Sequence, residues 1–153
     1  MTTSYKLLLF AHILSVVALV GSSIGTHVLA LRARAAGPAR TADFVADVEW
    51  LGRRLQAPAA ALVLAFGIWL GRDAGWDFSE TWLVLGMVGF AVCAVISGGY
   101  VGPASRRVLA LITSHGPADP GVLAGVRRVL VVSWIELAIL IAIMLDMAVK
   151  PGV

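Results

Sequence analysis

The stretch Leu7–Leu31 reads LLLFAHILSVVALVGSSIGTHVLAL, and it decides the fold. It contains no Lys, Arg, Asp or Glu, and as a helix it would be about 37 Å long. About 20 apolar residues cross the hydrocarbon core of a bilayer, which is roughly 30 Å thick. The stretch therefore predicts a transmembrane helix, and it is longer than the apolar core of a typical secretory signal.

Three further apolar stretches extend this prediction to the whole chain. Hydrophobic residues make up 59% of the 153 residues and charged residues 14%, whereas a soluble domain carries about 25% charged residues. The four predicted spans cover approximately residues 5–32, 53–71, 81–104 and 126–149. We expect an all-α fold in which residues 1–153 form a single transmembrane domain, an integral membrane four-helix bundle in the lipid bilayer.

The arginines predict how this bundle is oriented in the membrane. The first and third connections contain most of them: Arg32, Arg34, Arg40, Arg53, Arg54, Arg106, Arg107, Arg127 and Arg128. The second connection has Arg72 against three acidic residues. The positive-inside rule then places the first and third connections in the cytoplasm and both termini outside, in a bacterial inner (cytoplasmic) membrane. Because topology explains the net charge of +3, we expect no nucleic acid partner.

The first cytoplasmic connection, residues 35–52, predicts a short amphipathic helix of its own. Phe44, Val45 and Val48 recur at helical spacing, and Thr41 is the expected N-cap. We expect this helix to lie on the inner membrane surface.

Glycine and proline indicate further breaks and contacts. The run GPADPG over Gly116–Gly121 predicts a break before the last helix. Pro58 is expected early in the second span, where a missing amide matters least. The pairs Gly21/Gly25 and Gly98/Gly102 have the spacing that lets helices approach closely, so they are candidates for helix contacts.

Two histidines lie in the first span. A projection at 100° per residue puts His12, Ser15, Ser23, Thr26 and His27 on one stripe, which should face other helices rather than lipid. The two histidines are about 22 Å apart along the axis, so they cannot ligate one metal ion, whose ligands lie within about 2.3 Å. His12 is the candidate ligand, with a single-histidine haem as one option and a carbonyl-bonded neutral histidine as the other. His27 is expected to be an interfacial residue.

Glu136 is the other ionisable group deep in a span. Its projected depth is slightly to the cytoplasmic side of mid-membrane, and Arg53 and Arg54 are its candidate partners. A structural hydrogen-bonding role for Glu136 is the alternative. Asp146, near the projected depth of His12, is a candidate hydrogen-bond partner for that histidine.

The order of these residues resembles a known family over nearly the whole chain. The first span reads KLLLFAHILSVV from Lys6, the second begins GRRLQAP at Gly52, and the fourth runs from Arg128 through Glu136 to Pro151. This pattern is similar to that of the HemJ-type protoporphyrinogen oxidases and of the copper-resistance-D-like membrane proteins. It most resembles small bacterial four-helix membrane proteins of unknown function in the same neighbourhood.

The resemblance implies a haem b linked to the first-span histidine, the position of His12. It also implies that Arg54 and Glu136 match an arginine before the second-span proline and a fourth-helix glutamate. Two segments depart from the family pattern. Those enzymes carry a Tyr-His pair late in the third span, where this chain has Tyr100–Val101, and Leu-Pro-Arg where this chain has Gly25–His27.

The leading hypothesis is a haem-associated or redox-linked membrane protein with an intramembrane site around His12. In it His12 is the metal ligand, and His12, Arg54 and Glu136 bind the cofactor, haem b. Two alternatives remain open: a HemJ-type protoporphyrinogen oxidase, and a non-catalytic accessory or scaffold subunit. The scaffold alternative predicts a homo-oligomer or a larger membrane complex.

Overall fold

The structure, a computed structural model, describes residues 2–150. Helical segments follow one another almost without interruption: α1 (Thr3–Ala36), α2 (Pro38–Leu51), η1 (Gly52–Gln56), α3 (Ala57–Ala74), α4 (Thr81–Ile96), η2 (Ser97–Val101), α5 (Gly102–His115) and α6 (Pro120–Val149). In this described part, four continuous helices are long and apolar enough to cross a membrane. The predicted all-α, four-helix architecture is therefore confirmed.

Short polar caps and glycine turns separate the four long helices. The Thr2 side chain accepts a hydrogen bond from the Tyr5 amide at the start of α1, and Asp119 Oδ1 accepts one from the Gly121 amide at the start of α6. Such side chains satisfy amides that have no partner inside the helix. Gly37 (φ 106°) and Gly116 (φ 84°) make the turns after α1 and α5, a backbone region that favours glycine.

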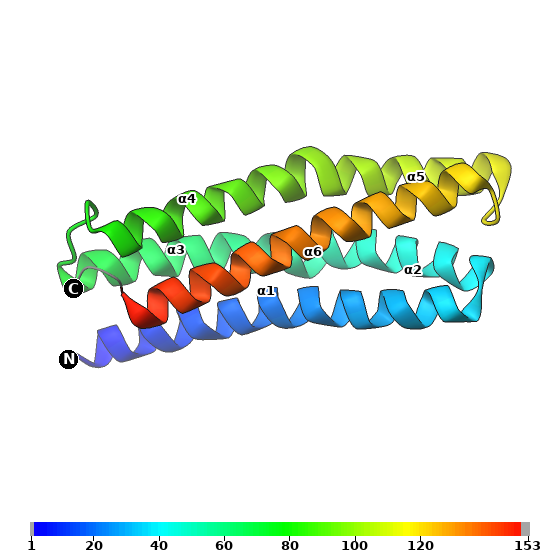
Figure 1. The fold of residues 1–153 in the computed structure, drawn as a ribbon. Helices are drawn as coiled ribbons and strands as arrows, with labels where there is room; N and C mark the ends of the chain where they lie inside the picture. The colour runs from blue at the N-terminus through cyan, green and yellow to red at the C-terminus, as the bar shows by residue number, and fades with distance from the viewer. Residues whose placement is uncertain (1, 151–153) are drawn as a thin grey trace.

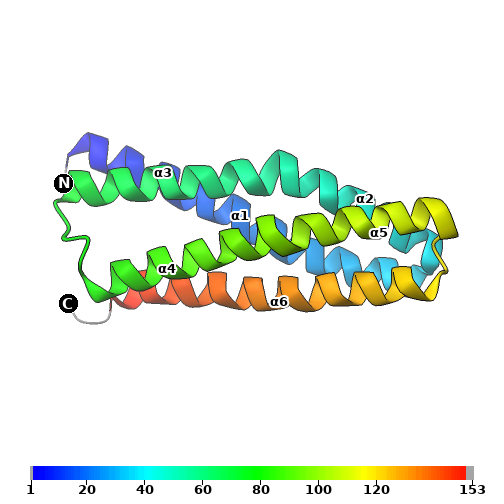
Figure 2. The same cartoon turned by 90° about the horizontal axis from the view of Figure 1, so that it is seen from above.

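The four helices form two antiparallel hairpins that lie side by side (Figures 1 and 2). In one hairpin α1 packs against α2 and α3, and in the other α6 packs against α4 and α5. The hairpins meet mainly where α2 touches α5 and α1 touches α6. After the predicted topology, we call the end with the α1–α2 and α5–α6 turns the inner end and the opposite end, with the α3–α4 connection, the outer end.

The hydrophobic core lies in the inner half of the bundle. It is built from small and β-branched residues with one aromatic ring: Ala30, Ala33, Phe44, Val45, Val108, Val122 and Val126. Toward the outer end the ribbons of α3 and α4 lie apart (Figure 2). The two hairpins are thus fastened to each other chiefly at the inner end.

The predicted amphipathic helix exists as α2, but its expected position is wrong. Phe44 and Val45 are 8% and 7% exposed in the core, because α2 continues through η1 into α3 as part of one helix, Pro38–Ala74. Thr41 is not the N-cap. It lies inside α2 and its hydroxyl donates to the carbonyls of Ala33 and Gly37, whereas Pro38 is the first helical residue.

A π-helical turn explains how this helix passes Pro58. The Ala57 amide donates to the carbonyl of Gly52, five residues back, and such a turn adds one residue to the helix. In a regular α-helix a proline clashes with the carbonyl four residues before it. The wider turn relieves that clash, so Pro58 lies well inside a helix and not where its missing amide matters least.

The third long helix contains the same kind of π-helical turn before a proline. The Gly102 amide donates to the Ser97 carbonyl, five residues back, directly before Pro103. α4, η2 and α5 therefore form one helix, Thr81–His115. The third predicted connection shrinks to the short segment after His115, where the break predicted from the glycine and proline run is found.

The glycine pairs singled out in the sequence do not mark contacts within the chain. A Cβ at Gly21, Gly25 or Gly98 would meet nothing within 4 Å. Close approach occurs at other glycines, such as Gly125, where a Cβ would lie 2.6 Å from the Val108 side chain. The outward glycines of η2 are therefore left without a neighbour in the protomer.

Candidate functional site

His12 lies between α1 and α3, half-buried, with one ring nitrogen bonded across the hairpin. Its Nδ1 is 3.1 Å from the backbone carbonyl oxygen of Val63. A carbonyl oxygen only accepts hydrogen bonds, so Nδ1 carries the proton and Nε2 of the neutral ring keeps its lone pair. This is the arrangement in which a histidine ligates a metal through Nε2 while Nδ1 holds the ring in orientation.

Gly67 makes room for the ring. A Cβ at Gly67 would lie 3.1 Å from Cε1 and 3.4 Å from Nδ1 of His12. The imidazole therefore rests directly on the backbone of α3, one helical turn from the carbonyl that it bonds. Sequence reasoning missed Gly67, and its only signal was a lone glycine in an otherwise apolar span.

His27 is buried inside the bundle, whereas its expected position at the membrane interface stays a prediction. It is 3% exposed, its Nδ1 bonds the Ser23 carbonyl at 2.8 Å, and its ring packs on Trp134 of α6 at 4.2 Å between centroids. Its Nε2 has no hydrogen-bond partner among the described residues. With Ser15 and Thr26, also buried, it confirms that the polar stripe of α1 faces other helices.

Glu136 pairs with a serine of η2. Its Oε1 accepts a hydrogen bond from the Ser97 hydroxyl, and its backbone carbonyl is 3.8 Å from the Cys93 sulfur. Within the described residues it forms no ion pair, since the salt bridges there join other residues. Sequence reasoning missed Ser97, which stands beside two glycines at the end of a strongly apolar run.

Neither predicted arginine partner reaches Glu136. Arg53 donates to Glu49, one turn earlier on the same helix, at 2.7 Å. Arg54 is exposed on η1, and the ion pairs of the described residues do not include it.

The three predicted site residues lie at different heights in the bundle. His12 is level with Val63, and Arg54 is nine residues before Val63, about 13 Å toward the inner end. His27 is level with Trp134, so Glu136 lies about 20 Å from His12 along the bundle axis. His12, Arg54 and Glu136 therefore do not form one cluster within the protomer.

Asp146 does not pair with His12. Its Oδ2 is buried without a hydrogen-bond partner in the described part of the chain, and it faces Gly86 of α4. His12 faces α3 in the other hairpin. The similar depth predicted for the two residues does not bring them together.

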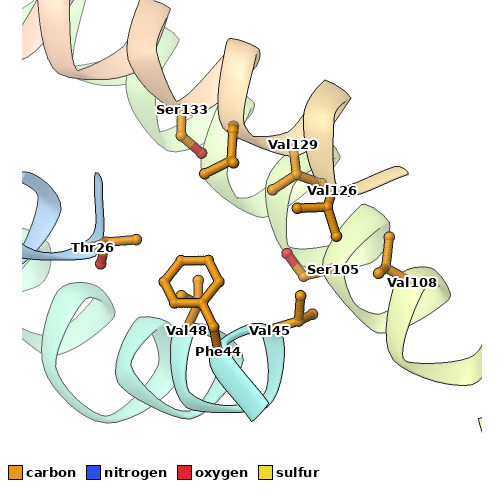
Figure 3. Close-up of a pocket in the computed structure, with 10 residues that line it drawn as sticks. Thr26, Phe44, Val45, Val48, Ser105, Val108, Val126, Val129 and Ser133 are labelled. Atoms are coloured by element: carbon orange, nitrogen blue, oxygen red, sulfur yellow. The ribbon is translucent and has the colours of Figure 1, made fainter. Parts of the chain in front are cut away.

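A small cavity lies where the two hairpins meet in the inner half (Figure 3). Its volume is about 20 Å³, enough for roughly one water molecule. Three hydroxyl residues from three helices, Thr26, Ser105 and Ser133, line it together with valines and Phe44. A second, larger depression of about 400 Å³ lies at the inner end between Arg34 and Arg127. His12 lines neither.

Aromatic residues and a lysine gather at the outer end. The Lys150 ammonium lies 4.5 Å and 4.9 Å from the ring centroids of Trp76 and Trp82, and the Trp82 indole donates to Glu80. In the connection between α3 and α4, the Ser79 amide donates to Asp77 and lowers the pKa of that carboxyl. This cluster fits the interfacial aromatic belt expected for membrane proteins.

The donor set around His12 limits what it can bind. Within residues 2–150 no group of three or more His, Cys, Asp and Glu side chains is placed to hold a metal ion. A site made of protein ligands alone is therefore not formed there. A haem needs one histidine, because its porphyrin supplies the other iron ligands.

Comparison with known proteins identifies the family. Residues 6–151 match DUF2269, a family described as predicted integral membrane proteins. No curated protein and no solved structure matches the chain. The chain belongs to the DUF2269 family, and it is a multi-pass integral membrane protein.

Proposed function

We propose that this member of the DUF2269 family binds haem b through His12 and acts as a haem-associated or redox-linked protein of the bacterial inner membrane. One observation carries the proposal. The hydrogen bond from Nδ1 of His12 to the Val63 carbonyl fixes the ring, and the lone pair of Nε2 is left available to a metal ion. The resemblance to the HemJ-type enzymes, in which a first-span histidine at the position of His12 is linked to haem b, supports the same role.

A haem held by one axial ligand needs one such donor from the protein. His12 would supply that ligand, and Gly67 would keep the imidazole close to α3. Haem iron, when bound, supplies one-electron redox chemistry whose potential depends on its axial ligand and surroundings. The roles of Arg54 and Glu136 as cofactor-binding groups remain predictions, and in the protomer they would act away from His12.

Absorption spectra of protein purified from haem-replete cells test the proposal. We expect a Soret band in the unchanged protein and its loss in His12→Ala. His115→Ala is the matched control, because His115 is exposed at the end of α5, and it should keep the band. Added imidazole should restore the band in His12→Ala if the ligand alone was lost. An unchanged protein without a Soret band, or an identical band in His12→Ala, would remove His12 from this role.

A non-catalytic accessory subunit is the second candidate. The exposed Ser97, paired with Glu136, and the open space beside Gly98 favour it, because polar groups in a span usually face protein. Cofactor-free protein that co-purifies with a defined membrane complex would favour this candidate over haem binding. Activity as a protoporphyrinogen oxidase is tested separately, by rescue of a strain that lacks its own oxidase.

A further inference from the structure

The second long helix has a charged outward face. Asp43, Asp47, Trp50 and Arg54 are all exposed, Trp50 by 59%. They recur every three or four residues, so they form one stripe along the helix. The stripe lies opposite the face that buries Val45. We call these four residues the helix-2 stripe.

Much of this stripe lies level with apolar parts of the other helices. Thr41 is level with Ala33 and Val63 with His12, so Trp50 and Arg54 are level with about Gly25 and Gly21 of α1. Those glycines belong to the apolar stretch of the first span. At similar heights the other helices expose Ile24, Val95 and Ile135.

Lipid is a poor neighbour for such a stripe. An ionisable side chain that faces hydrocarbon is costly and is normally paired or turned toward protein. Arg54 has no acidic partner within the described residues. The outward face of η1 therefore calls for a polar or charged surface opposite it.

The third long helix offers such a surface, which we call the glycine face. A Cβ at Gly102 would lie 3.7 Å from Nη1 of Arg106, so these two residues share one face, and Ser97 lies one π-helical turn before Gly102. Ser97 holds the carboxylate of Glu136. Gly98 lies between Arg106 and the Ser97–Glu136 pair along the helix, and a Cβ at Gly98 would meet nothing within 4 Å.

We propose that the helix-2 stripe of one copy docks on the glycine face of a second copy. Charge is complementary at both ends: Asp43, which also lies 3.6 Å from the exposed Arg40 of its own helix, meets Arg106 near the inner end, and Arg54 meets Glu136 toward the middle. Between them, the exposed Trp50 fills the open space at Gly98.

The spacing along the two helices supports this register. Asp43 and Arg54 are eleven residues apart, about 16 Å, and Arg106 and Ser97 are nine residues apart, about 14 Å. Arginine side chains are long enough to cover that difference. All copies have the same orientation in the membrane because they insert with one topology. In that orientation Asp43 and Arg106 both lie toward the inner end, and Arg54 and Glu136 both lie toward the middle.

The two surfaces are different parts of the chain, so the contact is heterologous. Such contacts build a closed ring when the rotation between copies closes. Each copy would then use both surfaces, and every Arg54 and every Glu136 would be paired. The inference does not depend on His12 as a haem ligand, because neither surface includes His12, and it gives Arg54 and Glu136 a role other than the cofactor binding that the resemblance implies.

Disulfide cross-linking in native membranes tests the contact. The background is Cys93→Ala, because Cys93 is the one cysteine of the chain. Trp50→Cys with Gly98→Cys in one chain should give linked dimers and larger multimers on oxidation. A mixture of the two single-cysteine chains should give dimers only. The control combines Trp50→Cys with Ile24→Cys, which is exposed at a similar height on α1, and should give no ladder.

Charge exchange gives a second, independent readout. Arg54→Glu or Glu136→Arg alone should lower the cross-linked fraction by about tenfold, since each places like charges together. The double exchange Arg54→Glu/Glu136→Arg should restore it. A protein that stays monomeric in lipid nanodiscs, or one that forms no Trp50–Gly98 cross-link, overturns the proposal. Single exchanges without effect, or a double exchange without rescue, also overturn it.

Discussion

Gly67 leaves room for the His12 ring on α3 because it has no side chain. A Cβ at this position would already lie 3.1 Å from the imidazole, and the branched side chain of valine would push the ring off α3. We therefore expect Gly67→Val to break the bond to Val63, to lower stability by about 1–3 kcal/mol and to weaken the Soret band. Absorption spectra and thermal unfolding in detergent measure both effects.

The control for this change is Gly25→Ala. Gly25 lies on α1, and a Cβ there would meet nothing within 4 Å. It should leave the spectrum unchanged and should not lower the unfolding temperature, because alanine is a better helix former than glycine. A Gly67→Val protein that is as stable as the Gly25→Ala protein would show that His12 does not rest on α3.

His27 makes a different prediction, because one of its nitrogens is buried without a partner. Replacing a buried polar group whose bonding is incomplete by an apolar group of similar size is often neutral or stabilising. We expect His27→Leu to unfold at the same or a higher temperature and to keep any Soret band. A loss of more than about 1 kcal/mol would mean that Nε2 has a partner in the membrane, such as a bound water.

Residue roles were only partly predictable from the sequence. The helical projection of α1 identified the buried stripe, since it depends on local geometry alone. The partners of His12 and Glu136 were not predictable, because they lie 51 and 39 residues away. Contacts between residues so far apart in the sequence depend on which helices pack together. The helical periodicity of a single sequence does not show that.

At the scale of elements, the π-helical turns adjust helical phase. The turn before Pro58 adds one residue, so the segments on either side face α1 correctly only because that residue is present. Deleting Leu55 together with Pro58→Ala should convert the turn to regular α-helix. Both flanking segments would keep their faces, and the protein should fold.

The matched control deletes Leu62 in the same Pro58→Ala background. Removal of a residue from the regular helix rotates everything beyond it by about 100°, which would turn the His12-facing surface of α3 away from α1. We expect this protein to express poorly or to unfold at a much lower temperature. Equal tolerance of the two deletions would show that the turn has no role in helical phase.

Elements were predictable wherever apolar length determined them, and less so near the inner end. The helical spacing of the apolar residues of α2 indicated a short amphipathic helix on the membrane surface, whereas the structure makes α2 the first half of a long helix. The prediction failed because the apolar side of α2 faces α1 and α5 instead of lipid. Periodicity shows that a helix has a buried face but not what covers it.

For the whole molecule, the even number of long helices puts the start of α1 and the end of α6 at the same end (Figure 1). Which side of the membrane this end faces is still a prediction from arginine distribution. Ser79 lies in the connection at that end, and Ser114 lies at the opposite end, where the exposed arginines of α5 are found. The positive-inside rule places Ser79 outside and Ser114 in the cytoplasm.

Labelling of single cysteines in intact cells decides the orientation. In the Cys93→Ala background, Ser79→Cys should react with a membrane-impermeant maleimide added outside, whereas Ser114→Cys should react only after the cells are opened. The opposite pattern would place both termini in the cytoplasm, and it would mean that the arginine-rich connections, and not the acidic one, are translocated. Either result leaves the two hairpins unchanged, because their packing rests on contacts between helices and not on the direction of insertion.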